Sequence, residues 1–202
     1  MPPYKITYFR GRALAEPIRL VLSYGGVEFE DDPFDPEDWP KVKPTTPFGT
    51  VPLLDMDGKI VRQSNAICRY FAKQFGLTGK DDLEALEVDA TVDTIHDLRE
   101  KLAKYHYETN EEAKAEKLEL IKELVPFYIE RFDEQVKENG GYFVGGDVTW
   151  ADLYFFGILD YLSFMAQRDI IEDAENLKAL KEKVFEIPSI KAWVEKRPDA
   201  FA

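Results

Sequence analysis

The pattern of hydrophobic and polar positions changes character near residue 80. Before that point, residues 4–9 alternate as a half-buried strand does, and residues 13–24 carry apolar side chains at helical spacing. A further strand is expected at 27–31, a hairpin over 51–63 and a helix over 64–75. The resulting order, β-α-β and then β-β-α, predicts an α/β domain of the thioredoxin-like type.

The rest of the chain has helical spacing only. Apolar residues recur at three- and four-residue steps over 83–105 and 112–138. Thr149 and Asp152 form a capping box that opens a helix over 150–166, and this helix is too apolar to lie on a surface. This part of the chain is therefore predicted to be an all-α domain around one buried helix. Two shorter helices are expected near 175–185 and 189–196.

A polar break over 78–82 separates the two patterns. We therefore predict an α/β thioredoxin-like domain at 1–78 and an all-helical domain at 83–202. With 202 residues and 45% hydrophobic content, the chain is long and apolar enough to fold into both.

The chain carries a net charge of −13, from 39 acidic and 26 basic residues. A surface of that sign repels phosphate backbones and anionic lipids, so neither a nucleic acid nor a membrane is expected as a partner. No apolar run reaches the roughly 20 residues of a membrane span, and residues 1–5 do not resemble a signal peptide. The single cysteine, Cys68, excludes internal disulfides and is typical of a reducing compartment, so a cytoplasmic location is expected.

The segment TVPLLD places Pro52 at the mouth of an apolar strand, and Gln63 and Ser64 follow where a helix begins. A cis Pro52 would turn the backbone groups of Val51 outward, so that an extended ligand pairs with Val51 as a strand would. Ser64 and the first N–H groups of the helix suit a carboxylate. A strand-edge proline or an ordinary N-cap explains either feature alone, but together they favour a site for a peptide-like ligand.

Basic side chains of the N-terminal segment are expected near this site although the whole chain is acidic. An anionic ligand would be met there. These side chains are Arg10, Arg12, Arg19, Lys41 and Lys43.

The thioredoxin-like domain lacks a C-x-x-C pair, which excludes disulfide exchange and requires the ligand to supply any reactive thiol. Tyr8 ends the first strand, beside the expected place of Pro52. A tyrosine there most often serves packing, but its hydroxyl next to a bound thiol favours the thiolate. Bringing a thiol of pKa ~8.5 to half ionisation near neutral pH takes about 1.5 pKa units, or roughly 2 kcal/mol. One hydrogen bond to a charged partner contributes about 1.5–3 kcal/mol, so a single hydroxyl suffices.

No other group of residues indicates metal or nucleophilic chemistry. His96 and His106 lack partners at ligand spacing. Asp93, His96 and Asp97 share one helical face, where a solvated acidic surface is favoured over a cation site. We therefore expect no bound metal.

Several segments in a fixed order resemble the glutathione transferases, most closely the sigma class. They are YKITYF with EPIR, DWP-x-x-K-P, PFGTVPLLDMDG, QSNAICRYFAKQFGL, VDTIHDLR, VTWADLYF and IKAWVEKRP. The resemblance covers the whole chain. It implies a thioredoxin-like domain that binds glutathione as co-substrate and a helical domain that completes a pocket for small hydrophobic electrophiles.

The resemblance also assigns roles by position. Tyr8 is similar to the tyrosine that activates the glutathione thiol. Trp39 and Lys43 resemble the side chains that meet the glycyl carboxylate. Val51, before the expected cis Pro52, resembles the residue that pairs with the cysteinyl backbone.

Three further residues complete the glutathione site that the resemblance implies. Gln63 and Ser64 resemble the clamp on the γ-glutamyl group, and Asp97 the carboxylate that reaches its amine across a homodimer. The full glutathione-binding set is Tyr8, Trp39, Lys43, Thr50, Val51, Pro52, Gln63, Ser64 and Asp97. The candidate walls of the electrophile pocket are Phe9, Arg10, Leu14, Lys104, Tyr107 and Tyr154.

Two positions depart from the sigma-class pattern. Leu14 stands where many relatives carry an arginine that points at the reactive sulfur, and Arg12 faces elsewhere on a helix. Arg10 is a candidate to replace that arginine. His96 stands within the segment where the vertebrate prostaglandin D synthases carry an acidic cluster that binds a divalent cation. Both departures count against a dedicated prostaglandin isomerase.

The resemblance therefore predicts a homodimeric, cytoplasmic glutathione transferase. It would add the thiolate to electrophilic carbon or reduce lipid hydroperoxides, in a detoxification role. A prostaglandin D synthase is the alternative enzyme. A ligand-storage or structural protein like the lens S-crystallins is the non-enzymatic alternative, and the intact set of Tyr8, Gln63 and Ser64 argues against it.

Overall fold

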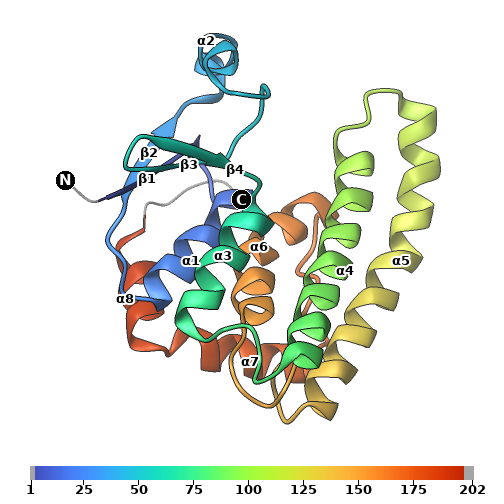
Figure 1. Ribbon diagram of the computed structural model, residues 1–202. Coiled ribbons are helices and arrows are strands. Elements are labelled where there is room, and N and C mark those ends of the chain that lie inside the picture. Colours follow the sequence, from blue (N-terminus) through green and yellow to red (C-terminus); the bar gives the residue numbers. More distant parts are fainter. Residues whose placement is uncertain (1–2, 198–202) are drawn as a thin grey trace.

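A computed structural model describes residues 3–197 of the chain. Residues 1–2 and 198–202, which include Pro198 of the segment IKAWVEKRP and the outer ends of both predicted domains, lie outside the described residues. Figure 1 shows a small sheet with helices beneath it and a pair of long helices to one side. The predicted combination of an α/β thioredoxin-like domain and a helical domain is confirmed.

The α/β domain contains the strands β1 (Tyr4–Phe9), β2 (Glu30–Phe34), β3 (Leu53–Met56) and β4 (Lys59–Arg62). They form one mixed sheet in the order β2-β1-β3-β4. β1 runs parallel to β2 and antiparallel to β3, and β3 pairs with β4 in a hairpin. The parallel pair requires a crossover connection, which contains helix α1 (Glu16–Tyr24).

The local turn signals of this domain act as the sequence predicts. Asp57 and Gly58 both have positive φ and connect the paired residues Met56 and Lys59, so the hairpin has a two-residue turn. The helix expected from residue 13 begins at Glu16, after a 3₁₀ turn, with Pro17 in its first turn. Helix α3 (Ser64–Phe75) ends at Gly76 in the left-handed conformation.

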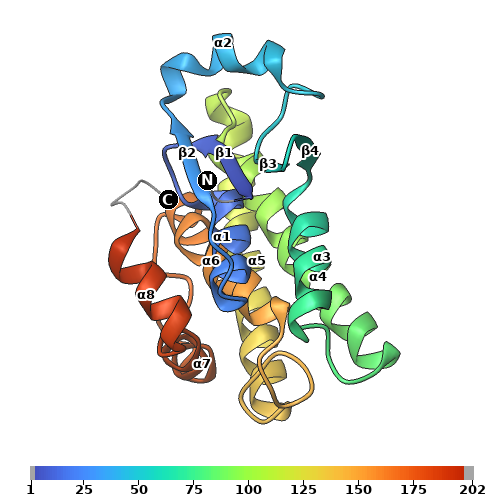
Figure 2. The same cartoon turned by 60° about the vertical axis from the view of Figure 1, so that its left-hand side comes forward.

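One prediction for the α/β domain is wrong in detail. The strand expected at 27–31 lies at Glu30–Phe34, because Phe29 packs its ring 5.1 Å from that of Trp193 instead of joining the sheet. Pro33 is tolerated in β2 because this strand lies at the edge of the sheet. The segment between β2 and β3 contains short helical turns, among them α2 (Trp39–Val42). Figures 1 and 2 place α2 beyond the sheet, on the side away from α1 and α3.

The second part of the chain is helical at the predicted places. Its helices are α4 (Asp82–His106), α5 (Glu111–Glu138), α6 (Trp150–Ala166), α7 (Glu175–Phe185) and α8 (Pro188–Lys196). Side-chain oxygens cap the two long helices, since Asp81 accepts from the N–H groups of Leu83 and Glu84, and Asn110 from that of Ala113. No helix among the described residues has both the length and the hydropathy needed to cross a bilayer.

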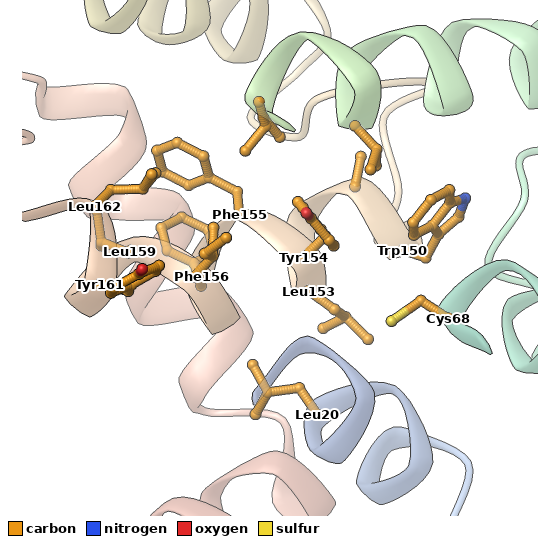
Figure 3. Packing of buried hydrophobic residues seen from close by; sticks show 14 of the residues in the cluster. Leu20, Cys68, Trp150, Leu153, Tyr154, Phe155, Phe156, Leu159, Tyr161 and Leu162 are labelled. Atoms are coloured by element: carbon orange, nitrogen blue, oxygen red, sulfur yellow. The ribbon is translucent and has the colours of Figure 1, made fainter. Parts of the chain in front are cut away.

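Helix α6 is the buried centre of the molecule, as its apolar sequence predicts. Figure 3 shows Leu20 of α1 and Cys68 of α3 next to the side chains of α6. The approach to α1 is closest at Gly157, where an added Cβ would lie 2.7 Å from the backbone nitrogen of Pro17. A glycine is therefore required for the helical domain to pack this closely on the α/β domain.

The capping box at the start of α6 is confirmed. The fully buried Asp152 accepts hydrogen bonds from the backbone N–H of Thr149 at 2.7 Å, from its hydroxyl at 2.9 Å and from the N–H of Phe143 at 3.0 Å. Burial raises the pKa of Asp152 to about 6, and these donors oppose the shift. The carboxylate thus joins the loop before α6 to its first turn.

Replacing Asp152 by alanine is expected to lower the free energy of unfolding by about 3 kcal/mol, because two buried N–H groups lose their acceptor. Urea unfolding followed by circular dichroism measures the change. Asp147→Ala is the control, because Asp147 also accepts from a backbone N–H but lies at the surface. Equal losses in the two variants would contradict a central role for Asp152.

Candidate active site

The sheet register places the predicted site residues at one end of three neighbouring strands. Thr7 pairs with Leu53, so the next positions along β1 and β3 are Tyr8 and Pro52. Leu53 also pairs with Arg62, so Gln63 continues β4 at the level of Pro52. Residues separated by more than forty positions in sequence therefore lie side by side at the mouth of the sheet.

The peptide bond between Val51 and Pro52 is cis, as predicted. Val51 precedes β3 and is half-buried. Within residues 3–197, its backbone N–H and C=O take part in no hydrogen bond of the sheet or of the neighbouring turns. These two groups are thus available to an extended ligand, as a free strand edge would be.

Gln63 and Ser64 form the start of α3 in an unusual way. Gln63 has a φ of 73°, a left-handed conformation that non-glycine residues adopt uncommonly, and it occupies the N-cap position. Ser64 is the first helical residue and is buried, and no side chain caps this helix. The reading of Ser64 as an ordinary N-cap is therefore wrong. Its hydroxyl and the first N–H groups of α3 are arranged for an anion.

Tyr8 is buried at the end of β1. Burial raises the pKa of its phenol to about 12, and a hydrogen bond from the backbone N–H of Leu14 only partly opposes that shift. The phenol is therefore neutral at physiological pH and keeps its proton. It can donate a hydrogen bond to an anion and cannot act as a base there.

Trp39 and Lys43 approach the same end of the sheet from the α2 segment. The Trp39 ring lies 5.3 Å from that of Phe9 and stacks on that of Phe34 at 5.9 Å. Lys43 is exposed, and its aliphatic stem runs along Gly49, where an added Cβ would lie 3.2 Å from the Lys43 Cε. The amine thus lies beside the loop that leads to Thr50, which is itself exposed.

Two tyrosines of the helical domain complete the surroundings of Tyr8. The hydroxyls of Tyr107, which follows α4, and Tyr161, in α6, are 2.9 Å apart. Tyr107 contributes to the raised pKa of Tyr8, and Tyr8 to that of Tyr161, in each case after burial, so both phenols lie near Tyr8. Tyr107 was predicted as a pocket wall, whereas Tyr161 was missed. Its only sequence signal is a polar aromatic residue seven positions after Tyr154 in an otherwise apolar helix.

Four other predicted residues lie apart from this cluster. Arg10 is exposed and its Nε lies 2.8 Å from Asp35. Lys104 lines a groove between α4 and α5. Tyr154 is fully buried, with its hydroxyl 3.5 Å from the His96 Nδ1, so it lines no open pocket. Asp97 is exposed on α4, and within the described residues it takes part in no ion pair.

The described residues hold no group of three or more His, Cys, Asp or Glu side chains arranged for a metal ion. What they do bring together is a cis-proline loop, a helix start and a buried neutral phenol. This combination suits an anionic, peptide-like ligand with a reactive atom next to Tyr8.

Comparison with known proteins gives matches over nearly the whole chain. The model of the glutathione S-transferase N-terminal domain matches residues 4–73, and that of the C-terminal domain matches residues 96–197. The chain is 45% identical over 199 residues to a glutathione S-transferase of Anopheles gambiae, with 98% of both chains covered. It is 44% identical over 196 residues to glutathione S-transferase S1 of Drosophila melanogaster, with 96% of this chain and 79% of that protein covered.

A solved structure also matches. The structure of prostaglandin synthase D of Nilaparvata lugens has a TM-score of 0.92 and 46% sequence identity. The match covers 98% of this chain and 100% of that one.

The phenol of Tyr8 is expected to titrate about two pKa units above an ordinary tyrosine, because its burial disfavours the phenolate. Ultraviolet titration of the ligand-free protein and of Tyr8→Phe measures this. The difference between the two curves should show almost no tyrosinate at pH 10, where an unperturbed tyrosine is half ionised. A half-ionised difference signal at that pH would contradict the neutral donor.

Proposed function

The chain belongs to the glutathione S-transferase family as a sigma-like glutathione transferase, and we propose that Tyr8 activates the glutathione thiol in its site. The observation that carries this proposal is the buried, neutral phenol next to the cis Val51-Pro52 bond and the start of α3. Glutathione is a tripeptide with two carboxylates and one thiol. Its backbone, its charges and its sulfur each find a counterpart at this end of the sheet.

We propose the following placement of the tripeptide. The cysteinyl backbone pairs with the free N–H and C=O of Val51, in the manner of an added strand. The γ-glutamyl carboxylate lies at the start of α3, where Ser64 and the helix N–H groups donate to it, with Gln63 beside it. The glycyl carboxylate lies against Trp39 and Lys43. This placement directs the sulfur towards Tyr8.

Tyr8 then acts by donating its proton in a hydrogen bond to the thiolate. A donor to a charged acceptor contributes about 1.5–3 kcal/mol, which corresponds to a lowering of the thiol pKa by about one to two units. The thiolate is the nucleophile, so a larger ionised fraction at neutral pH raises the rate. Binding the electrophile next to it converts a bimolecular reaction into one between neighbours.

The electrophile side of the cleft suits hydrophobic substrates that carry an oxygen. Phe9 and Leu14 are apolar and half-buried, whereas Tyr107 and Tyr161 present hydroxyls. With a lipid hydroperoxide, the thiolate attacks one peroxide oxygen, the O–O bond breaks, and the lipid leaves as an alcohol after taking up a proton. A second glutathione reduces the sulfenic acid to the disulfide and water. This chemistry supports a role in detoxifying products of lipid peroxidation.

We also propose that the enzyme is a homodimer. Five of the nine large hydrophobic side chains exposed in the described part come from the edge strand β4, the loop before β3, α3 and the start of α4. They are Phe48, Ile60, Tyr70, Leu83 and Leu86. The Arg62 guanidinium lies 3.7 Å from the centre of the Phe48 ring and holds it at this surface. A second copy would cover this face and bring the exposed Asp97 within reach of the partner's γ-glutamyl amine.

Two further proposals concern organisation and location. We place the domain boundary in the connection between α3 and α4, so that the α/β domain ends at 78 and the helical domain begins at 83. The two matching domain models leave this connection between them. We place the enzyme in the cytoplasm, because its one cysteine is a free, buried thiol.

Prostaglandin D synthesis is a second candidate activity, because the Nilaparvata lugens protein at 46% identity carries that name. Leu14 in place of an arginine at the sulfur argues against it. Product analysis with a prostaglandin endoperoxide, run beside an aryl halide and a lipid hydroperoxide, separates the two activities.

Replacing Tyr8 by phenylalanine is expected to lower kcat/KM by about 10- to 100-fold, because one hydrogen bond to the thiolate is lost. The KM for glutathione should change little, since the phenol is only one contact of the tripeptide. Tyr4→Phe is the matched control, because Tyr4 lies on the same strand and packs its ring against Phe71. Unchanged turnover in Tyr8→Phe would overturn the proposed role of Tyr8.

The Phe48→Asp variant is expected to shift the protein from dimer to monomer, because it places a charge in the proposed interface. Sedimentation velocity measures the mass against the 23.3 kDa of one chain. Leu120→Asp, on α5, is the control, since Leu120 is equally exposed but lies outside the proposed face. A wild-type protein that sediments as a monomer at micromolar concentration would disprove the proposed dimer.

A further inference from the structure

Because residue 14 is a leucine, it brings no positive charge to the glutathione sulfur as an arginine would. Any cation that stabilises the thiolate must come from another position around Tyr8. Leu14 contributes only its backbone N–H, which donates to the Tyr8 oxygen. A neutral hydrogen bond shields a thiolate less effectively than a cation does in a buried site. The arginines of the surrounding elements are Arg10, Arg12, Arg19 and Arg99.

Three of these arginines pair with carboxylates that offset their charge. Arg10 pairs with Asp35 at 2.8 Å and both side chains are half exposed. Arg12 pairs with Asp160 of α6 at 2.6 Å. Arg19 is buried between Glu16, at 3.1 Å, and Asp31, at 2.9 Å. The sequence-based candidate, Arg10, is therefore directed to the end of β2 and away from the sulfur.

Arg99 differs from the other three. Its side chain is only 13% exposed, yet its one ionic partner within residues 3–197 is Glu100, the next residue of its own helix, which is 46% exposed. Its Nε is buried and has no hydrogen-bond partner among the described residues; the Arg12 Nε shares this property, but the Arg12 guanidinium also pairs with Asp160 of another helix. A buried guanidinium with an unused donor is costly unless a ligand completes it. Because Glu100 is half exposed, solvent weakens its offset of the Arg99 charge.

Arg99 lies between two contacts of α4 with α6: the His96 Nδ1 is 3.5 Å from the Tyr154 hydroxyl, and the Tyr107 hydroxyl after α4 is 2.9 Å from that of Tyr161. Burial raises the pKa of Tyr8 and of Tyr161, and the charge of Arg99 opposes both shifts; at Tyr8 the paired Arg19 opposes the shift more strongly than Arg99 does. Tyr8 in turn contributes to the raised pKa of Tyr161, after burial and Tyr107, so the charge of Arg99 and the two phenols act on one another. The titratable groups that face Arg99 are Tyr8 from β1, Tyr154 and Tyr161 from α6, and His96 and Glu100 from α4.

We propose that Arg99 provides the positive charge that stabilises the glutathione thiolate, from the helical domain, in place of an arginine at position 14. The proposal rests on the proposed role of Tyr8 and adds a second stabilising group to it. Tyr8 binds the sulfur directly, and Arg99 acts through the field across the cleft. The thiolate completes the electrostatic environment of Arg99 when glutathione binds.

This arrangement divides thiol activation between the two domains. The hydroxyl comes from the sheet and the charge comes from α4. An opposite charge near an ionisable group shifts its pKa by one unit or more when the pair is buried, and by less as distance and water intervene. The expected contribution of Arg99 is therefore about one pKa unit. A tenfold larger thiolate fraction at a pH below the thiol pKa follows from that shift.

The test is the pKa of the bound thiol in Arg99→Met, measured by ultraviolet titration of the enzyme saturated with glutathione. We expect a rise of about one unit, a roughly tenfold loss of turnover at neutral pH, and recovery of turnover at alkaline pH. Arg131→Met is the matched control, because Arg131 lies exposed on α5 and its loss changes the net charge equally. Thiol titration should not respond to that variant.

Two further variants separate charge from structure. Arg99→Lys keeps the charge and should keep the pH profile within a few tenths of a unit. Leu14→Arg in the Arg99→Met background should restore the lower thiol pKa from the other side of the sulfur. If Arg99→Met does not fold, Arg99→Gln takes its place and is read in the same way.

The outcomes distinguish this proposal from the one on which it rests. An unchanged thiol pKa in Arg99→Met, with a raised one in Tyr8→Phe, would overturn the role of Arg99 and leave that of Tyr8 intact. A raised KM for glutathione without a shifted pH profile would also overturn it, because that result describes a residue that only shapes the site. If the Tyr8→Phe variant leaves the thiol pKa unchanged, the proposed role of Tyr8 is overturned, and with it the proposal for Arg99 that rests on it.

Discussion

The contact between α6 and α1 is the constraint on which the active site depends. At Gly157 the two helices approach so closely that an added Cβ would lie 2.7 Å from the Pro17 nitrogen. α1 follows the strand that carries Tyr8, and α6 carries Tyr161, so this contact fixes how far the sheet lies from the helical wall. In a transferase, that distance decides whether the two bound reactants meet.

A network of polar contacts also ties α1 to α8 and to the residue that follows it. The buried Glu16 of α1 accepts from the Trp193 Nε1 at 2.9 Å and pairs with Arg197 at 2.7 Å and Arg19 at 3.1 Å. These partners neutralise a carboxylate that would otherwise be costly to bury. At Tyr8, by contrast, burial is only partly offset by neighbouring charges, and it keeps the phenol protonated. The protein thus balances its buried charges in the scaffold and leaves the polar groups of the cleft for a ligand.

The sequence predicts most elements because each buries one face against a neighbour, which leaves a readable period in β1, in the hairpin and in α4 to α6. The prediction of a strand at 27–31 fails because Phe29 in that segment packs against Trp193, which is far away in the sequence, and does not join the sheet. Within the site, Tyr8, Pro52 and Ser64 have local signals at strand ends and a helix start. Tyr161 has only a weak signal and Arg99 has none, because their positions relative to Tyr8 depend on how the two domains pack together. The position of Arg10 could not be predicted either, because it depends on pairing with Asp35, which follows β2 in the same domain.

The composition of β2 has a consequence for the behaviour of the protein in a crowded solution. This outer strand carries Glu30, Asp31 and Asp32 in succession, and then Pro33, which has no N–H to offer. An incoming strand would meet repulsion and an interrupted ladder there. Accidental strand addition, the usual first step towards fibrils, is therefore blocked at one border of the sheet.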